Sequence, residues 1–248
     1  MVEQNYKRYL NYNSLRVSSI KPKEFTSLLN KVVLCRHGKT SYNTGGQIQG
    51  STDIPLSTIG INEVQQDAIS LNVSSLIIKY ICSSDMKRAE ETASIYSTQL
   101  KIAQTTSIPL LREYGSGIWE GCKTTDLIKF DPYHNIWTEK PITYSFGSIP
   151  ENGESFLDFL DRVYQGVSLL LNLSNGINDD EKLLVVSHAT VNRAIRFLYL
   201  LSREVGDDIN VSTAQMYEKH IFYSQSGNFI KIPHGYFGID TTNYSFVK

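Results

Sequence analysis

The stretch Val32-Val33-Leu34-Cys35-Arg36-His37-Gly38-Lys39-Thr40 decides the fold of this 248-residue chain. Its first four residues are apolar and include two β-branched side chains, a run that is typical of a buried strand in a parallel sheet. A cation, an imidazole and a glycine follow at the carboxyl end of that strand. Open parallel sheets bind their ligands at the carboxyl ends of the strands. Arg36 and His37 therefore mark a candidate site.

Two further segments repeat this layout. Leu76–Cys82 leads into Ser83–Ala89, and Leu183–Val186 leads into Ser187-His188-Ala189-Thr190. If the three strands are parallel neighbours, their polar ends meet in one pocket. The side chains that would converge there are Arg36, His37, Arg88 and His188. Because arginine presents a planar fork of donors that matches tetrahedral oxyanions, this set predicts a phosphoryl pocket.

Six groups of residues form an ordered pattern over about residues 31–200. They are Arg36-His37-Gly38 with Thr40 and Asn43; Gln49-Gly50 with Asp53, Pro55-Leu56-Ser57 and Gly60; Ser83–Ala89 with Thr92-Ala93; Leu111-Arg112-Glu113 with Gly117 and Trp119-Glu120-Gly121; Gly153-Glu154-Ser155 with Arg162; and Ser187-His188 with Arg193. This pattern resembles the histidine phosphatase superfamily, in the branch that contains cofactor-dependent phosphoglycerate mutases and their phosphatase relatives.

The resemblance implies an α/β fold, a three-layer doubly wound and mostly parallel sheet with helices on both faces. It also implies that His37 is the nucleophile that becomes phosphorylated and that Glu113 donates a proton to the leaving oxygen. The groups that would hold the phosphoryl oxygens are Arg36, Arg88 and His188. A neutral imidazole is nucleophilic without a separate base, since its ordinary pKa is about 6.5. We expect no metal and no cofactor.

A second set of residues is expected to bind substrate: Lys39, Asn43, Gln49, Gly50, Ser51, Glu154 and Ala189. Asn43, Gln49 and Ser51 could donate hydrogen bonds to the substrate, or they could serve turns in the loop. Glu154 could bind a substrate hydroxyl, or it could start the helix that runs through Arg162. Lys39 stands where phosphatase relatives often carry Glu or Gln, and Ala189-Thr190 replaces a usual Gly pair.

Two residues next to the nucleophile are expected to shape the phosphate loop. Gly38 permits close approach of a phosphate and an unusual φ angle. Thr40 can cap the helix that follows.

The domain organisation expected from the sequence is an N-terminal extension over residues 1–30 and a catalytic domain over residues 31–248. A lid-like insertion is expected at about residues 122–152. Helices are predicted at 59–68, 87–100, 156–173 and 191–201, each lying between strands. Near the end, residues 220–223 and 229–232 flank Ser226-Gly227-Asn228 and predict a hairpin.

Composition favours a single folded domain, with 41% hydrophobic and 20% charged residues. The formal net charge of -1 gives no reason to expect nucleic acid or acidic membranes as partners. Three cysteines without disulfide or metal-ligand spacing point to a reducing compartment, and the cytoplasm is the expected location. The expected partner is a small phosphorylated substrate. The sequence does not decide whether the chain forms a homodimer.

The segment from Cys122 to Asn152 separates the candidate activities. In the mutases the corresponding insertion carries paired arginines, whereas here it contains no arginine and only Lys123, Lys129 and Lys140. Without a clamp for a second acidic group, water could attack the phosphohistidine, so a phosphomonoesterase acting on a small metabolite is the preferred function. The alternatives are a cofactor-dependent phosphoglycerate mutase and a non-catalytic phosphate-binding relative. Lys39 could bind a second phosphate or a carboxylate, which keeps a mutase or sugar-bisphosphatase in view.

Overall fold

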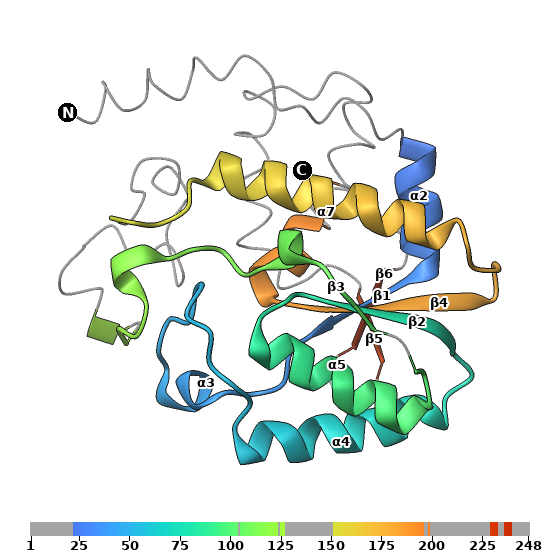
Figure 1. Cartoon of the computed structure of the whole chain (residues 1–248), viewed down its shortest axis with the longest axis horizontal. Helices are drawn as coiled ribbons and strands as arrows, with labels where there is room; N and C mark the ends of the chain where they lie inside the picture. The colour runs from blue at the N-terminus through green and yellow to red at the C-terminus, as the bar shows by residue number, and fades with distance from the viewer. Residues whose placement is uncertain are drawn as a thin grey trace.

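The computed structural model describes residues 22–103, 105–123, 125–126, 151–195, 198, 229–232 and 236–239. Within these ranges a sheet lies between helices on its two faces (Figure 1). Its strands are β1 (Val32–Arg36), β2 (Ile77–Ser83), β3 (Thr105–Ser107), β4 (Glu181–Ser187), β5 (Phe229–Ile232) and β6 (Tyr236–Ile239). The helices are α2 (Pro22–Lys31), α3 (Ser41–Gly45), α4 (Thr58–Asn72), α5 (Lys87–Leu100) and α7 (Phe156–Ser174), with 3-10 turns η1 (Pro109–Leu111) and η2 (Gly117–Trp119). Residues 189–195 are also helical.

The strand order is β3-β2-β4-β1-β6-β5. The first four strands are parallel, and β6 and β5 are antiparallel to their neighbours. In the register between β1 and β4, Arg36 lies opposite Ser187. In the register between β2 and β4, Ser83 lies opposite Val186. The carboxyl ends of the three central strands therefore finish at one edge of the sheet, as the sequence predicts.

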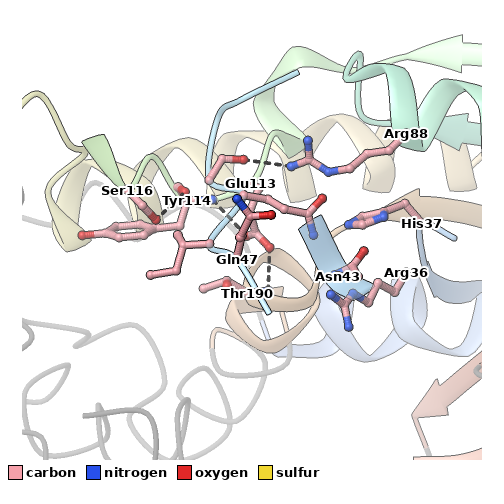
Figure 2. A pocket seen from close by; sticks show the side chains of 12 residues that line it. Arg36, His37, Asn43, Gln47, Arg88, Glu113, Tyr114, Ser116 and Thr190 are labelled. Atoms are coloured by element: carbon pink, nitrogen blue, oxygen red, sulfur yellow. Dashed lines mark hydrogen bonds between the residues drawn. The ribbon is translucent and has the colours of Figure 1, made fainter. Parts of the chain in front are cut away.

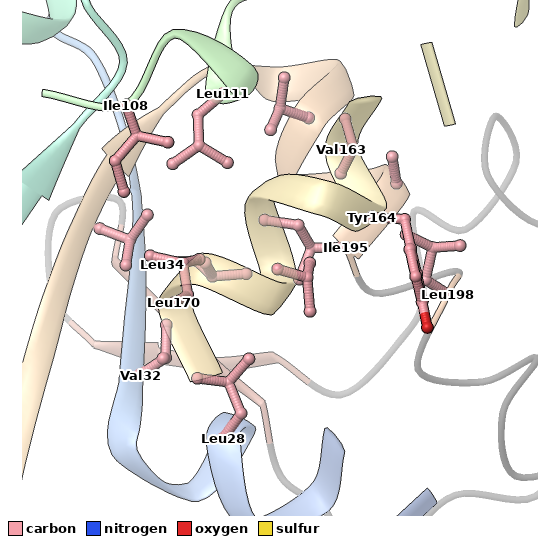
Figure 3. Packing of buried hydrophobic residues seen from close by; sticks show 14 of the residues in the cluster. Leu28, Val32, Leu34, Ile108, Leu111, Val163, Tyr164, Leu170, Ile195 and Leu198 are labelled. Carbon is pink, nitrogen blue, oxygen red and sulfur yellow. The ribbon is translucent and has the colours of Figure 1, made fainter. Parts of the chain in front are cut away.

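Both faces of β1 and of most of β4 are buried because each face packs against helices. On one face, Val32 and Leu34 contact a cluster that includes residues of α2, α7 and the helix at 189–195 (Figure 3). On the other face, Val33 and Cys35 belong to a cluster with residues of α4 and α5. This two-sided burial explains the continuous apolar run in the sequence, since a half-exposed strand would alternate.

The predicted fold class is confirmed, and the helix positions follow the prediction closely. The helix predicted at 87–100 has those bounds, the one at 59–68 extends over Thr58–Asn72, and the one at 156–173 ends at Ser174. Ser57 and Ser155 accept hydrogen bonds from Gly60 N and Asp158 N, and so cap α4 and α7. The helix predicted at 191–201 begins earlier, at residue 189.

Parts of the expected organisation differ from the structure or fall outside the residues that it describes. Residues 22–30 of the expected extension belong to α2, and Leu28 and Leu29 of this helix are buried in the core. Residues 229–232 form β5, whose hairpin partner in the described part of the chain is β6. The partner expected at 220–223, residues 1–21, and residues 127–150 of the expected lid lie outside the described residues.

Adjacent leucines on α7 test the packing of this helix on the sheet. Leu170 is fully buried in the core, whereas Leu169 is 44% exposed. We expect Leu170→Ala to lower the free energy of unfolding by about 2–5 kcal/mol, because it removes apolar contacts and leaves a cavity. Leu169→Ala should change it by less than about 1 kcal/mol. Urea unfolding followed by circular dichroism measures both, and equal losses would contradict the packing described here.

Candidate active site

A cavity of about 270 Å³ opens at the carboxyl ends of the central strands. Figure 2 shows side chains from the strand ends and from the facing loops pointing into it. The cavity is lined by Arg36, His37, Asn43, Gln47, Ile48, Gln49, Gly50, Arg88, Glu113, Tyr114, Ser116 and Thr190. Cationic, imidazole, amide and carboxylate groups thus share one small space.

His37 follows β1 directly and is held at both its backbone and its ring. Its backbone N–H donates to the Ser187 carbonyl at 2.9 Å, which extends the pairing of β1 with β4. Its Nδ1 lies 2.7 Å from the Gly38 carbonyl oxygen. A carbonyl oxygen can only accept, so Nδ1 carries the hydrogen and donates it. In the neutral ring the lone pair is therefore on Nε2, the atom that can act as a nucleophile.

The surroundings keep the His37 ring neutral. Burial, together with the charges of Arg36 and Arg88, lowers its pKa from 6.5 to about 3, although the hydrogen bond to Gly38 acts in the opposite direction. An imidazolium in this position would be poorly solvated and would face two guanidinium groups. His37 is thus ready to attack an electrophile at neutral and mildly acidic pH.

His188 lies beside His37 at the end of β4, with the two ring centroids 5.1 Å apart. Its side chain is fully buried, and its Nε2 lies 2.9 Å from the Ser84 hydroxyl oxygen. Burial lowers the pKa of His188 well below 6.5, and the neighbouring His37 and Arg88 lower it further. Nδ1 of His188 is buried and has no hydrogen-bond partner among the described residues. That nitrogen can bind a group that enters the site.

Arg88 reaches the cavity from the first turn of α5 and is completely buried. Its Nη1 donates to the Thr52 carbonyl at 2.8 Å, and its Nη2 donates to the Gly50 carbonyl at 2.8 Å. Its Nε is buried without a partner in the described part of the chain. Two carbonyls therefore fix the plane of the guanidinium and leave Nε, the nitrogen without a partner, as a donor for an anion.

Burial lowers the pKa values of Arg88 and Arg36. The nearby carboxylate of Glu113 acts in the opposite direction on both residues. Arg36 also lies near Arg193, whose charge lowers its pKa further. Placing two desolvated guanidinium groups together costs free energy in the empty site, and a phosphoryl group would relieve that cost.

Glu120 organises the loop that holds Arg88. Its Oε1 accepts hydrogen bonds from the backbone N–H and hydroxyl of Ser51 and from Ser116 N, and its Oε2 accepts one from the Thr52 hydroxyl, all at 2.6–3.0 Å. Burial raises the pKa of Glu120, but these hydrogen bonds outweigh it, so its pKa lies below the usual value. Gly50 has a φ of 51°, and a Cβ at this position would meet Glu120. The loop carbonyls that bind Arg88 thus depend on a partly buried carboxylate.

Glu113 follows η1 and points into the cavity toward His37 (Figure 2). Its Oε1 accepts a hydrogen bond from Tyr114 N at 2.9 Å, and its Oε2 lies 3.4 Å from Thr190 N. Thr190 N belongs to the first turn of the helix at 189–195. Glu113 is the carboxyl group that lines the cavity within the described ranges, and it can exchange a proton with a bound molecule.

Asn43, Gln49 and Gly50 of the expected substrate-binding set do line the cavity. Thr40 caps α3 with a capping box, in which Asn43 N donates to the Thr40 hydroxyl and Thr40 N donates to Asn43 Oδ1. The Thr40 hydroxyl donates to Gln49 Oε1 at 2.9 Å. Asn43 and Gln49 thus form hydrogen bonds within the turn, as the alternative expectation states, and they also line the cavity.

The other four members of that set do not line the cavity. Lys39 forms an ion pair with Glu63 of α4 at 2.5 Å and borders a separate surface pocket. Ser51 is exposed and binds Glu120. Glu154 pairs with Arg162, and Ala189 begins a helix whose next residue, Thr190, lines the cavity instead. Lys39, Ser51 and Glu154 are thus taken by tertiary partners that sequence spacing does not show.

Sequence reasoning also missed six residues at the site. They are Gln47, Ile48, Tyr114, Ser116 and Thr190 in the cavity wall, and Ser84, which holds His188. Ser84 and Thr190 directly follow predicted strand ends, a signal that could have identified them. The other four lie in loops and depend on the path of the backbone.

The reason for a glycine at position 38 differs from the expectation. Its φ is not among the positive values of the described glycines, so the expected unusual φ is wrong. Instead, a Cβ at Gly38 would lie 2.5 Å from Val64 Cγ2 and 3.1 Å from the Gly60 carbonyl oxygen. The glycine is needed because α4 packs tightly against the loop that carries His37.

With this geometry in place, comparison with known proteins identifies the family. The family model described as histidine phosphatase superfamily (branch 1) matches residues 32–226, and the chain belongs to this superfamily. A curated relative, "Probable phosphoglycerate mutase GpmB" of Yersinia pestis (strain Pestoides F), is 32% identical over 158 residues. That match covers 64% of this chain and 69% of the relative.

Solved structures of similar fold include two phosphatases. Mycobacterial glucosyl-3-phosphoglycerate phosphatase is 26% identical with a TM-score of 0.57, and the match covers 70% of this chain and 79% of that one. Alpha-ribazole phosphatase from Shigella flexneri is 25% identical with a TM-score of 0.55, covering 76% of this chain and 84% of that one. The relatives are therefore named as mutases and as phosphatases, and the chain is similar to both.

Two further findings concern metals and membranes. In the described ranges, no group of three or more His, Cys, Asp or Glu side chains is arranged to hold a metal ion. None of the helices in those ranges has the length and apolar character needed to cross a bilayer.

The protonation state of the two active-site rings can be observed directly. We expect the imidazole resonances of His37 and His188 to stay in their neutral positions between about pH 8 and pH 5, because both pKa values are lowered and the protonated forms appear only at lower pH. Heteronuclear NMR of ¹⁵N-histidine protein measures this, with assignments from His37→Gln and His188→Gln. A midpoint near pH 6.5 for either ring would contradict the electrostatic description of the site.

The loop held by Glu120 should control anion affinity. We expect Glu120→Gln to weaken competitive inhibition by inorganic phosphate or vanadate by about ten-fold or more, because an amide cannot accept all four hydrogen bonds and the carbonyls that orient Arg88 would shift. Glu63→Gln serves as the control, since Glu63 binds Lys39 outside the cavity. An unchanged inhibition constant in a folded Glu120→Gln variant would show that Arg88 does not depend on this loop.

Proposed function

We propose that this protein is a phosphomonoesterase that hydrolyses a small phosphorylated metabolite through a phosphohistidine intermediate on His37. One observation carries the proposal: the two buried side-chain atoms without hydrogen-bond partners in the described residues, Arg88 Nε and His188 Nδ1, belong to residues next to a buried neutral imidazole. A phosphoryl group bound beside His37 would accept hydrogen bonds from both donors. Arg36, at the end of the same strand as His37, would neutralise further charge.

In the first step, His37 Nε2 attacks phosphorus. The N–P bond forms as the bond between phosphorus and the ester oxygen breaks, and that bonding pair stays with the leaving oxygen. Glu113, protonated at the start, transfers its proton to this oxygen, so the leaving group departs as a neutral alcohol. Arg36, Arg88 and His188 stabilise the charge on the three phosphoryl oxygens throughout.

In the second step, water attacks the phosphohistidine. The Glu113 carboxylate takes a proton from the water as the new O–P bond forms. The N–P bond breaks, and its electron pair returns to Nε2 of His37. Inorganic phosphate leaves with Glu113 protonated again, so the cycle closes with water as the only other reactant. The arginines and histidine of this chain supply the charge stabilisation, and we propose a metal-independent reaction on that basis.

Phosphatase activity is favoured over mutase activity by the distribution of cations. The guanidinium groups that line the cavity, Arg36 and Arg88, both belong to the phosphoryl end of the site. A mutase must retain a bisphosphorylated intermediate, yet residues 122–152 contain no arginine. Two of the structural relatives are named phosphatases, which supports the same choice. Because the curated relatives carry the name of a mutase, that activity is the second candidate.

The cytoplasm is the proposed location. Cys35 and Cys82 are free, buried thiols, and burial raises the pKa of each to about 12. Core cysteines kept as protonated thiols are usual in a reducing compartment.

Phosphate release from 4-nitrophenyl phosphate and from a panel of phosphorylated metabolites, including 3-phosphoglycerate, tests the proposal. We expect release that is unaffected by EDTA and that falls by at least about 10³-fold in His37→Ala, because the proposed covalent intermediate forms on His37. After rapid quench, a native sample with substrate should contain acid-labile, base-stable phosphate on the protein, and His37→Ala should contain none.

The same panel separates the alternatives. Transfer between the positions of phosphoglycerate that depends on added 2,3-bisphosphoglycerate, without net phosphate release, would replace the phosphatase by the mutase. Binding of phosphate without any turnover or phosphoprotein would leave only the non-catalytic reading. Loss of activity with EDTA that added metal restores would overturn the metal-independent mechanism.

A further inference from the structure

Arg162, in the second turn of α7, lies next to the segment that carries Glu113. Its guanidinium is 5.3 Å from the centre of the Phe159 ring, and its side chain is 21% exposed. Nη1 donates to the carbonyls of Leu110 and Arg112 at 2.9 and 2.8 Å, and Nη2 lies 3.4 Å from the carbonyl of Glu113. One side chain thus contacts three carbonyl groups within four residues of the chain.

Glu154 takes the remaining donors of Arg162. Nε of Arg162 donates to Glu154 Oε1 at 2.8 Å, and Nη2 donates to Glu154 Oε2 at 2.7 Å. All five N–H donors of the guanidinium are therefore engaged. Glu154 also binds the backbone on the far side of Glu113, because its Oε2 accepts from Gly115 N at 3.2 Å and its own N–H donates to the Gly115 carbonyl at 2.8 Å. We call these two residues the Glu154–Arg162 clamp.

The clamp holds the backbone on both sides of Glu113, whereas the carboxyl group itself has weak support. Its hydrogen bonds come from the N–H of the next residue, Tyr114, and from Thr190 N at 3.4 Å. Both donors are backbone groups, and in the described part of the chain no side chain donates to this carboxyl group. The position of the acid in the cavity is therefore determined mainly by the path of residues 110–115.

We propose that the Glu154–Arg162 clamp is a positioning device for proton transfer, which sets the distance between the Glu113 carboxyl group and the leaving oxygen. This inference rests on the proposed function, because it assigns a role in the first step of that reaction. Neither clamp residue lines the cavity, so both act through Glu113 and not by contact with the substrate.

Lysine cannot replace Arg162 in this role. An ammonium group has three donors at one point, whereas the clamp requires five donors spread over a planar group. Arg162→Lys would preserve the positive charge beside Glu154 but would release at least some of the three carbonyls. Lys79 on β2 provides a control outside residues 110–115: its ammonium group pairs with Glu181 of β4 at 3.0 Å, and neither residue lines the cavity.

The dependence on the leaving group tests the proposal. A nitrophenolate departs without a proton, whereas the alkoxide of glycerol 2-phosphate needs one from Glu113. For Arg162→Lys we expect kcat/KM to fall about 10- to 100-fold with glycerol 2-phosphate and less than about three-fold with 4-nitrophenyl phosphate. The ratio kcat/KM is the correct quantity, since it reports the step in which the leaving group departs. Lys79→Arg, which exchanges one cation for the other in that ion pair, should change neither value beyond about two-fold.

A double variant shows whether Arg162 acts through Glu113. Glu113→Gln alone should reproduce the selective loss on glycerol 2-phosphate, and adding Arg162→Lys to it should cause no further loss on that substrate. Circular dichroism and the unfolding midpoint establish that each variant is folded. Glu154→Gln, which removes the charge from the pair, provides a second variant with the same expected selectivity and a smaller loss.

The positioning role of the clamp and the phosphatase proposal are overturned by different results. Equal losses on the two substrates, or additive losses in the double variant, would overturn the positioning role while leaving the phosphatase proposal intact. A Glu154→Gln or Arg162→Lys variant with native values on both substrates would overturn it as well. A native chain that hydrolyses neither ester would overturn the proposed function, and the role of the clamp with it.

Discussion

The parallel pairing of β1 with β4 is the constraint on which the site depends. In this register Arg36 lies opposite Ser187, and the backbone N–H of His37 donates to the Ser187 carbonyl. The two histidines that follow these strands therefore end at the same level, with their rings 5.1 Å apart. A slip of one residue would reverse the side-chain directions along a strand and separate the rings. The two buried clusters on the faces of the sheet fix that register through the apolar side chains of both strands.

The same electrostatic surroundings serve two purposes. Burial and the charges of Arg36 and Arg88 make protonation of His37 unfavourable, which keeps its Nε2 lone pair available. They also make the site favourable for an anion, since two desolvated guanidinium groups gain more from a phosphoryl group than they would in water. In the proposed function, affinity for phosphate and nucleophilicity of the imidazole would therefore both follow from one arrangement. A more polar pocket would weaken both.

The sequence could predict the fold and the phosphoryl half of the site because those features depend on local patterns. Apolar runs of four to seven residues located β1, β2 and β4, and the polar residues at their ends located His37, His188 and Arg88. The spacing of apolar residues in the segments after these strands predicted the helices in the same way. These signals are local, and the parallel topology then brings them together.

The rest of the site could not be predicted because it depends on tertiary partners. Lys39 follows the nucleophile closely, yet Glu63 on α4 binds its ammonium group away from the cavity. Glu154 lies in a matching motif, yet its carboxylate is used by Arg162. Nothing in the spacing of either residue indicates these partners. Conversely, Tyr114 and Ser116 line the cavity because the backbone turns beside Glu113, a path that the sequence does not specify on its own.

This contrast divides the site into two halves with different physical origins. The phosphoryl half is built from strand ends and from a loop held by Glu120, so its geometry is tied to the packed core. The acid is placed differently, on a segment that a helix side chain holds by its carbonyl groups. Because the phosphoryl half recognises only the transferred group, it is compatible with many alcohols, and selectivity must come from residues beyond it. Glu113 must be placed to suit the leaving oxygen of whichever alcohol is bound. A backbone held by Glu154 and Arg162 can keep the carboxyl group in that place without contacting the alcohol itself.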